Sequence, residues 1–407
     1  MQRILSTELA RHIGETVTVA GWVHRRRLLK SVAFLILRDA AGLAQIVTTP
    51  SAVQDLSEGS VVEVTATVTE KDGVELTSPS VRVLSRVSVP LPLELHRPAL
   101  TATLPTQLDH AAVALRHPAR AAALRVAAAA TGAFRETLHR QRFVEIHTPK
   151  IVGSATESGA NVFRLDYFGR PAYLAQSPQF YKQMMVGVFE RVYEVGPVFR
   201  AEPHDTARHL AQYTSLDAEL GFIADHRDVM AVLTSVLAGM AAAVEPWAAL
   251  TVPGEIPAVP FAEALAIAGA PADEPDLAPA HERAVGEWAR REHGSDFVFV
   301  TGYPMAKRPF YTHPDPADGR LSNGFDLLFR GVELVTGGQR LHRYEDYLSV
   351  LGGDLSPYAG YLDAFRYGMP PHGGFAIGLE RFVSRLLEVP NVRQVTAFPR
   401  DLHRLVP

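Results

Sequence analysis

Apolar and polar residues alternate with a period of two along the first quarter of the chain. Residues 16–23 and 62–69 both follow this alternation. A period of two puts successive side chains on opposite faces of the backbone, which is typical of half-buried strands. The triplet Lys71-Asp72-Gly73 supplies a turn suited to a hairpin. Several short strands within residues 1–95 predict a small barrel or sandwich.

The rest of the chain mixes helical and strand-like patterns. Residues 119–140 and 229–240 carry apolar side chains at helical spacing, and residues 297–300 form a short apolar run typical of a strand. The proline-punctuated segment 96–118 predicts a linker between two parts. We therefore expect an α+β protein with an N-terminal domain at 1–95 and a larger domain at 119–407.

Composition narrows the class of protein. The 407 residues are 47% apolar and 21% charged, so a large core is available. The formal net charge is −4, so any contact with nucleic acid must come from local basic patches. The chain has no cysteine, which excludes disulfides, thiolate zinc sites and cysteine nucleophiles. The sequence shows no signal peptide and no apolar run of membrane-spanning length, so we expect a cytoplasmic protein without membrane contact.

Three clusters of residues carry candidate chemistry. Arg200 and Glu202 precede a loop that holds Arg208 and His209, and arginine forks suit phosphate oxygens. A solvated surface hairpin is the alternative interpretation of this cluster. A second cluster spans residues 331–340, where a glutamate and a threonine suit Mg²⁺ and an arginine suits a carboxylate. A third spans residues 373–381, where glycines permit close approach of the backbone to a ligand.

In order and spacing, these clusters resemble the motifs of the class II aminoacyl-tRNA synthetases. Residues 143–149 resemble motif 1, residues 199–202 motif 2, and residues 378–381 motif 3. Gln-Ser-Pro-Gln-Phe-Tyr-Lys at 176–182 and Gly-Gly-Gln-Arg at 337–340 resemble the aspartyl-tRNA synthetases, and the compact length is similar to their archaeal type. The resemblance implies an N-terminal OB-fold barrel that binds the anticodon, a catalytic antiparallel sheet flanked by helices, and a homodimer formed through motif 1.

The resemblance also implies the reaction, in which ATP and aspartate form aspartyl-adenylate and the aspartyl group moves to the 3′ end of tRNA. Arg200 is then expected at the α-phosphate, Glu202 beside the adenosine, and Arg381 at the γ-phosphate. Arg208 and His209 on the motif 2 loop are expected to reach the same γ-phosphate. The Mg²⁺ ligands implied are Glu333 and Thr336.

Two further groups of residues are implied by the same resemblance. Lys182 and Arg340 would pair with the side-chain carboxylate of aspartate, and the residues around its ammonium would be Glu157, Gln179 and Asp217. Residues 156–160 resemble the family's mobile loop, which closes over the amino acid. A neutral asparagine would leave two buried cations unpaired, which costs several kcal/mol. Lys182 therefore favours aspartate.

For tRNA, the resemblance points to one face of the barrel. Phe34 and Gln45 match positions that stack on and hydrogen-bond an anticodon base, and Arg25 lies in a basic run suited to phosphates. His24 and Pro79 resemble the relaxed form of the archaeal enzymes, which accepts both tRNA(Asp) and tRNA(Asn). The expected partners are therefore both tRNAs, together with an amidotransferase that would convert Asp-tRNA(Asn).

Three alternatives remain open from the sequence. The first is an asparaginyl-tRNA synthetase, and the second is an ATP-dependent asparagine synthetase on the same core. The third is a non-catalytic RNA-binding protein with a degenerate core, but the four charged residues of the motifs argue against it; they are Arg200, Glu202, Glu333 and Arg381.

Overall fold

The computed structural model describes residues 2–71, 73–153, 161–203, 205–353 and 355–407. The chain separates into two compact units, Met1–Ala119 and Arg120–Pro407. Each unit has its own hydrophobic core.

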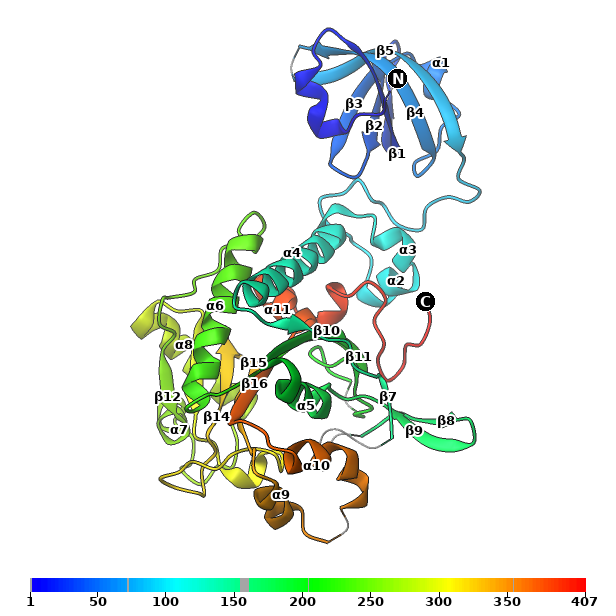
Figure 1. The fold of residues 1–407 in the computed structure, drawn as a ribbon. Helices are drawn as coiled ribbons and strands as arrows, with labels where there is room; N and C mark the ends of the chain where they lie inside the picture. Colours follow the sequence, from blue (N-terminus) through cyan, green and yellow to red (C-terminus); the bar gives the residue numbers. More distant parts are fainter. Residues whose placement is uncertain (1, 72, 154–160, 204, 354) are drawn as a thin grey trace. The chain divides into compact units, whose positions relative to one another are not determined.

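The first unit is built around a closed five-stranded barrel with the strand order β1-β2-β3-β5-β4 (Figure 1). The strands are β1 (Thr16–Leu28), β2 (Ala33–Arg38), β3 (Leu43–Thr48), β4 (Val61–Glu70) and β5 (Val74–Ser85), accompanied by the short helices η1 (Ser6–Arg11) and α1 (Pro50–Val53). Along β4, Val62 and Val64 are fully buried, whereas Glu63 and Thr65 are half-buried. The predicted period of two and the predicted small barrel are confirmed.

The proline-punctuated segment after the barrel contains two short helices. They are α2 (Leu104–Asp109) and α3 (Ala111–Ala114), and both belong to the first compact unit. Ala114 of α3 packs with Leu93 and Leu95 in a small apolar cluster. The functional division into residues 1–95, 96–118 and 119–407 stays a prediction.

The second unit contains an eight-stranded sheet with the order β12-β13-β14-β15-β16-β11-β10-β6. The strands are β6 (Val144–Glu145), β10 (Arg191–Phe199), β11 (Gln212–Gly221), β12 (Ala258–Pro260), β13 (Phe297–Thr301), β14 (Gly324–Phe329), β15 (Val332–Arg340) and β16 (His372–Gly378). Among the described strands of this sheet, only the outermost pairs, β12 with β13 and β6 with β10, are parallel. A separate three-stranded sheet joins β7 (Ile151–Val152), β9 (Arg170–Leu174) and β8 (Arg164–Tyr167).

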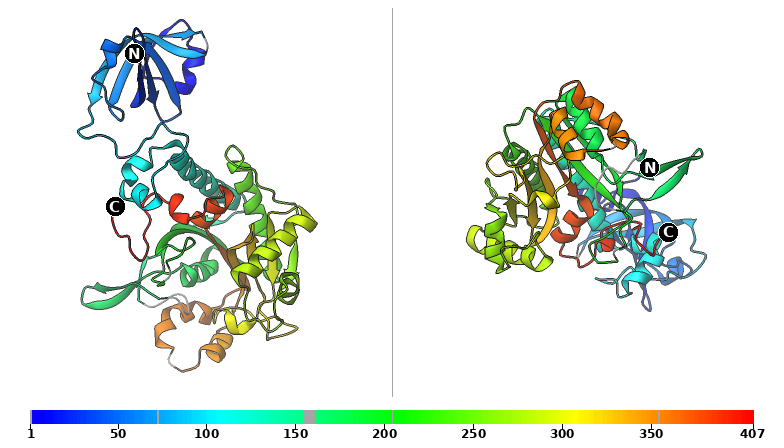
Figure 2. Two further views of the ribbon diagram at one scale, coloured as in Figure 1. Left: turned by 180° about the vertical axis from the view of Figure 1, so that it is seen from behind. Right: turned by 90° about the horizontal axis from the view of Figure 1, so that it is seen from below.

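Helices cover both faces of the large sheet (Figures 1 and 2). The main core joins one face to α4 (Pro118–Arg140), α6 (His226–Val244) and α11 (Leu379–Leu386). The opposite face meets α5 (Gln179–Phe189). The remaining helices are α7 (Phe261–Ala268), α8 (Pro279–His293), α9 (Tyr344–Leu351), α10 (Ala359–Arg366), η2 (Met305–Lys307), η3 (Ser356–Tyr358) and η4 (Val392–Gln394). The expected α+β class and the helices predicted at 119–140 and 229–240 are confirmed.

Helix α6 is the one described helix that is long and apolar enough to span a membrane by length and composition. Val229, Leu233 and Met240 of α6 are fully buried in the main core, whereas Ala231, Ala238 and Ala242 are exposed. One buried apolar face is expected of a helix that packs against a core.

Candidate functional site

Successive side chains of β11 point alternately into the main core and into a cavity. Leu216 and Ala218 face the main core, while Ser215 and Asp217 line a cavity of about 410 Å³ on the opposite face. Eleven residues that the sequence indicated line this cavity: Gln179, Lys182, Arg200, Glu202, Arg208, His209, Asp217, Glu333, Thr336, Arg340 and Arg381. Glu157 and the expected mobile loop at 156–160 lie outside the described residues.

The predicted hairpin of motif 2 is formed by β10 and β11, which pair in antiparallel register from Arg191 opposite Leu220 to Phe199 opposite Gln212. Arg200 follows the last residue of β10, and its guanidinium lies 3.8 Å from the Glu202 carboxylate and 5.9 Å from the centre of the Tyr213 ring. The hairpin therefore presents a cation, an anion and an aromatic face to the cavity. The sequence had given no role to Tyr213.

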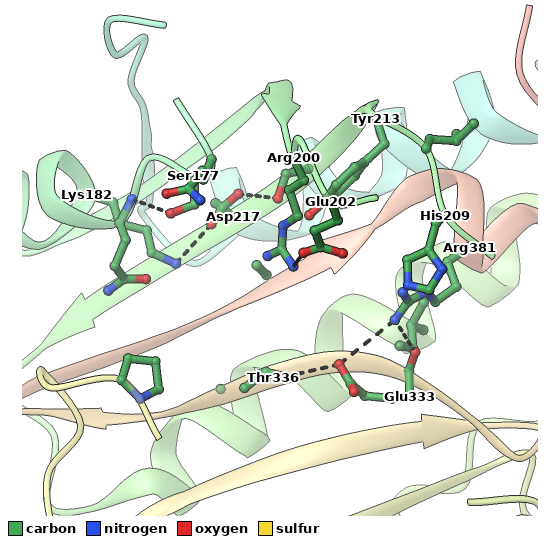
Figure 3. A pocket seen from close by; sticks show the side chains of 18 of the residues that line it. Ser177, Lys182, Arg200, Glu202, His209, Tyr213, Asp217, Glu333, Thr336 and Arg381 are labelled. Atoms are coloured by element: carbon green, nitrogen blue, oxygen red, sulfur yellow. Dashed lines mark hydrogen bonds and ion pairs between the residues drawn. The ribbon is translucent and has the colours of Figure 1, made fainter. Parts of the chain in front are cut away.

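The opposite wall is formed by β15 and α11. In Figure 3, Lys182 and Asp217 lie at one end of the cavity, and His209, Glu333 and Arg381 gather at the other. Arg381, in the first turn of α11, donates a 2.8 Å hydrogen bond to the backbone carbonyl of Glu333. The loop residue Arg208 lies 3.6 Å from Glu282. Four cations of the motifs, Arg200, Arg208, Arg340 and Arg381, thus border one cavity that also contains His209.

A β-bulge explains how Glu333 and Thr336 meet. Residues three apart in a regular strand point to opposite faces. Here Leu328 pairs with Glu333 but Leu327 pairs with Val335, so Leu334 is an extra residue in β15. The bulge returns Glu333 and Thr336 to the same face, where Thr336 Oγ1 donates to Glu333 Oε1 over 3.3 Å.

Glu333 has surroundings that suit a divalent cation. Its pKa is raised, first by loss of hydration and then by the nearby carboxylates of Asp326 and Glu282. A cation would relieve this repulsion, and carboxylate and hydroxyl oxygens are the ligands that Mg²⁺ prefers. No cluster of three or more histidine, aspartate or glutamate side chains within the described ranges is arranged to hold a metal ion. Mg²⁺ commonly binds through one or two carboxylates together with substrate phosphates, so Glu333 and Thr336 suit a shared site of that kind.

The end of the cavity that contains Lys182 and Asp217 has a buried network of four charges. Lys182 Nζ lies 3.0 Å from Asp217 Oδ1 and 3.2 Å from Glu219 Oε2, and Arg340 Nε lies 3.1 Å from Glu219 Oε1. All four side chains are at most 8% exposed. The two cations therefore converge on Glu219, a carboxylate of the chain itself. Glu219 was missed as a site residue, although it follows Asp217 by two positions and so shares its face of β11.

Glycines in the neighbouring strand make this network possible. A Cβ atom on Gly374 would lie 2.0 Å from Glu219 Oε2 and 2.2 Å from the backbone oxygen of Ala218. The carbonyl oxygen of Gly374 accepts a 3.0 Å hydrogen bond from Arg340, and that of Phe375 accepts one of 3.2 Å from Lys182. Strand β16 thus comes close enough to bind both cations only because it has no side chain at residue 374.

Charge pairing keeps the Glu219 carboxylate ionised. Burial alone would raise the pKa of Glu219, but Arg340 and Lys182 outweigh it and hold that pKa below its ordinary value. Burial lowers the pKa of the neighbouring His372 to about 4, so its imidazole is neutral at pH 7. The site therefore contains two cations and two carboxylates before any substrate enters.

The barrel presents a second group of predicted residues. Arg25, Phe34 and Gln45 line one hollow of about 260 Å³ together with Arg27 and Ile36. Gln45 Nε2 donates to Glu75 over 3.2 Å. The outward faces of β1, β2 and β3 therefore combine an aromatic ring with two cations, which is the composition expected of a surface for unstacked bases.

His24 and Pro79 are placed differently. His24 is an extra residue of a bulge in β1, and its pKa is lowered by burial and by Arg38. Pro79 lies in a bulge of β5, after Ser78 with its positive φ of 53°. Neither residue lines the hollow of Phe34.

Both compact units contain residues that match the models of known protein families. Residues 103–402 match the model for "tRNA synthetases class II (D, K and N)". Residues 17–84 match the model for the "OB-fold nucleic acid binding domain".

Similar proteins cover the whole chain. It is 46% identical to an aspartate–tRNA(Asp/Asn) ligase of Thermus thermophilus, with 100% of each chain covered. It is 45% identical to a ligase of the same name in Deinococcus radiodurans, covering 100% of this chain and 99% of the relative. Among solved structures, asparaginyl-tRNA synthetase from Pyrococcus horikoshii with asparaginyl-adenylate matches with a TM-score of 0.90 and 30% identity, covering 100% of both chains.

Proposed function

The chain belongs to the class II tRNA synthetases of the D, K and N group, and on that basis we propose that it activates L-aspartate with ATP and transfers the aspartyl group to the 3′ end of tRNA. The observation that carries the choice of aspartate is the pair of buried cations, Lys182 and Arg340, at one end of the cavity. The other end of the cavity gathers the cations and the acidic residue that a magnesium-bound triphosphate requires.

The chemistry needs positioning and charge neutralisation rather than a protein nucleophile. In-line attack of the aspartate α-carboxylate on the α-phosphate brings two anions together. We assign Arg200 to the α-phosphate, with Glu202 and Tyr213 beside the adenosine. Arg381 and the loop residues Arg208 and His209 then bind the γ-phosphate, and all six residues line the same cavity.

Glu333 and Thr336 are the residues that would hold Mg²⁺. When bound, the ion would neutralise phosphate charge and orient the triphosphate. The residues of the chain contribute independently of it. Arg381 restrains the backbone of Glu333, and the β15 bulge sets Glu333 and Thr336 side by side.

Lys182 and Arg340 select the amino acid. Asp217 and Gln179 are assigned to its ammonium, and Glu157 is proposed as a third partner from the sequence alone. An aspartate side chain would bring its carboxylate to two cations that have little contact with water. Asparagine would bring a neutral amide, which the same two cations attract far more weakly than a carboxylate. This argument favours aspartate over asparagine, as do the names of the relatives that match at 46% and 45% identity.

The barrel contributes tRNA binding. Arg25, Phe34 and Gln45 are assigned to the anticodon, with stacking of a base on the Phe34 ring. His24 and Pro79 are assigned to recognition of its last base. The two bulges would present them differently from regular strand residues.

Relaxed tRNA choice is part of the proposal. The Thermus and Deinococcus relatives are named as ligases of both tRNA(Asp) and tRNA(Asn), which supports it. The product Asp-tRNA(Asn) would then require an amidotransferase. We further propose a cytoplasmic homodimer formed through the motif 1 strand, since β6 lies at an edge of the large sheet.

A charging assay tests this function. The purified protein is given radiolabelled aspartate, ATP and unmodified transcripts of tRNA(Asp) or tRNA(Asn). We expect both transcripts to be charged. Relaxed recognition would be overturned if tRNA(Asn) were charged at under about one-hundredth the efficiency of tRNA(Asp). A tenfold change in efficiency corresponds to about 1.4 kcal/mol. Charging of neither transcript would overturn the proposed reaction.

A further inference from the structure

A row of buried polar groups lies behind Gln179. Gln179 Nε2 donates to Gln183 Oε1 over 2.9 Å, and Gln183 Nε2 lies 2.9 Å from His372 Nε2. His372 Nδ1 lies 2.9 Å from the backbone oxygen of Pro370. Gln183 and His372 are both 0% exposed, so water does not compete for these contacts.

The direction of each hydrogen bond follows from the end of the row. The Pro370 oxygen can only accept, so His372 Nδ1 carries a proton. Because the buried imidazole is neutral at pH 7, its Nε2 atom carries only a lone pair and must accept. Gln183 therefore turns its NH₂ group toward His372 and its oxygen toward Gln179. Gln179 must therefore donate its own NH₂ group to the Gln183 oxygen. The carbonyl oxygen of Gln179 is then the atom of its amide that faces the cavity.

Two tyrosines hold the middle of the row. Tyr361 Oη donates to Gln183 Oε1 over 3.0 Å, and Tyr347 Oη lies 3.3 Å from Gln183 Nε2 and 2.7 Å from Tyr361 Oη. The contact with Tyr361 supplies a second proton to the same oxygen and fits the orientation set by His372, although a tyrosine hydroxyl, which can donate or accept, does not itself determine that orientation. Tyr347 is 0% exposed and Tyr361 4%, so water has little access to these contacts.

We infer that Pro370, His372 and Gln183 are positioning residues that fix the Gln179 amide with its carbonyl oxygen toward the substrate ammonium. This inference rests on the proposed function, since it assigns the ammonium of the activated amino acid to Gln179. A flipped amide would present an NH₂ group to a cation instead. The row therefore selects a ligand that carries a positive α-substituent, while Lys182 and Arg340 select the anionic side chain.

Removing the middle of the row tests the inference. Gln183→Met keeps the length of the side chain and removes its hydrogen bonds to Gln179 and His372, together with those to the two tyrosines. A hydrogen bond to a charged group corresponds to a change of about 10- to 100-fold, so we expect the KM for aspartate in ATP–pyrophosphate exchange to rise by that factor. The KM for ATP should change less than about threefold, because RT ln 3 is under 1 kcal/mol. Gln394→Met makes the same chemical change at a glutamine that does not line the cavity, and serves as the control.

A second ligand separates orientation from general damage. Succinate is aspartate without the ammonium, so its inhibition constant should stay within about threefold of wild type in Gln183→Met, the same RT ln 3 margin. Equal weakening of succinate and aspartate, or an unchanged KM for aspartate, would overturn the inference. If Gln183→Met does not fold, His372→Phe carries the test, because it keeps a ring near Phe365 and removes the acceptor. Wild-type protein that fails to exchange with aspartate would refute the proposed function instead.

Discussion

Replacing Lys182 by methionine removes one of the two cations at the amino-acid end of the cavity. The ammonium is within 3.2 Å of both Asp217 and Glu219 and is 1% exposed. Lys182→Met leaves two carboxylates with Arg340 alone, so the network changes from two cations and two anions to a net charge of −1. An anionic substrate side chain then meets repulsion in place of attraction.

The size of the effect follows from Coulomb's law. Two unit charges about 4 Å apart interact by about 4 kcal/mol at an effective dielectric constant of about 20. At about 1.4 kcal/mol per factor of ten, the kcat/KM for aspartate should fall by about 1,000-fold. Asparagine, with its neutral side chain, should lose much less. The preference for aspartate should therefore nearly disappear.

The assay is ATP–pyrophosphate exchange with each amino acid, measured beside thermal unfolding. Leaving buried carboxylates unpaired destabilises a protein by about 3–5 kcal/mol, so Lys182→Met should also lower Tm. Adding Glu219→Gln restores neutrality, and this double variant should recover Tm but not aspartate activation. Lys150→Met is the matched control, since Lys150 pairs with Glu194 at 2.8 Å and does not line the cavity. The role of Lys182 would be refuted if the folded Lys182→Met protein kept a kcat/KM for aspartate within about tenfold of wild type. That change corresponds to a loss of under about 1.4 kcal/mol.

Three further predictions concern other parts of the molecule. Glu333→Gln should raise the Mg²⁺ concentration needed for exchange. Because the pKa of Glu333 is raised above 4.5, the affinity of the wild-type protein for Mg²⁺ should begin to fall at a higher pH than it would with an ordinary glutamate. A Mg²⁺ titration that is the same at every pH would contradict this. Gly374→Ala should lower Tm and abolish aspartate activation because the added Cβ atom collides with Glu219. Gly360→Ala should do neither, because its Cβ atom would have nothing within 4 Å. Equal unfolding curves for the two variants would count against the close approach of β16 to Glu219. Phe34→Ala should lower tRNA charging by about 5- to 150-fold, from a stacking contribution of about 1–3 kcal/mol, and leave pyrophosphate exchange unchanged; loss of exchange would show that the ring supports the fold instead.

Local periodicity predicted most of the architecture. The barrel strands could be predicted because Val62 and Val64 alternate with polar residues over a half-buried surface. Helix α6 could be predicted because Val229, Leu233 and Met240 recur at helical spacing and are fully buried. Both patterns are local, so they could be interpreted before any contact between distant residues was known.

Contacts between distant residues were harder to predict. Glu333 and Thr336 share a face only through the extra residue Leu334, and no simple period predicts a bulge. Glu219 joins the cation network because Lys182 and Arg340 reach it from α5 and β15. The sequence identified the two cations by their motifs but not the carboxylate between them, since that pairing depends on the register of three elements.

The role of Gln183 was also hidden in the sequence. It lies four residues after Gln179, so the two side chains share one face of α5. Its other partner, His372, comes from β16, 189 positions away in the chain. Only the assembled sheet brings the imidazole to the helix.

The most direct measurement compares aspartate with asparagine in ATP–pyrophosphate exchange by the unmodified protein. If Lys182 and Arg340 receive an anionic side chain, kcat/KM for aspartate should exceed that for asparagine by at least about 100-fold, equivalent to about 2.7 kcal/mol. Equal or faster exchange with asparagine would contradict the account.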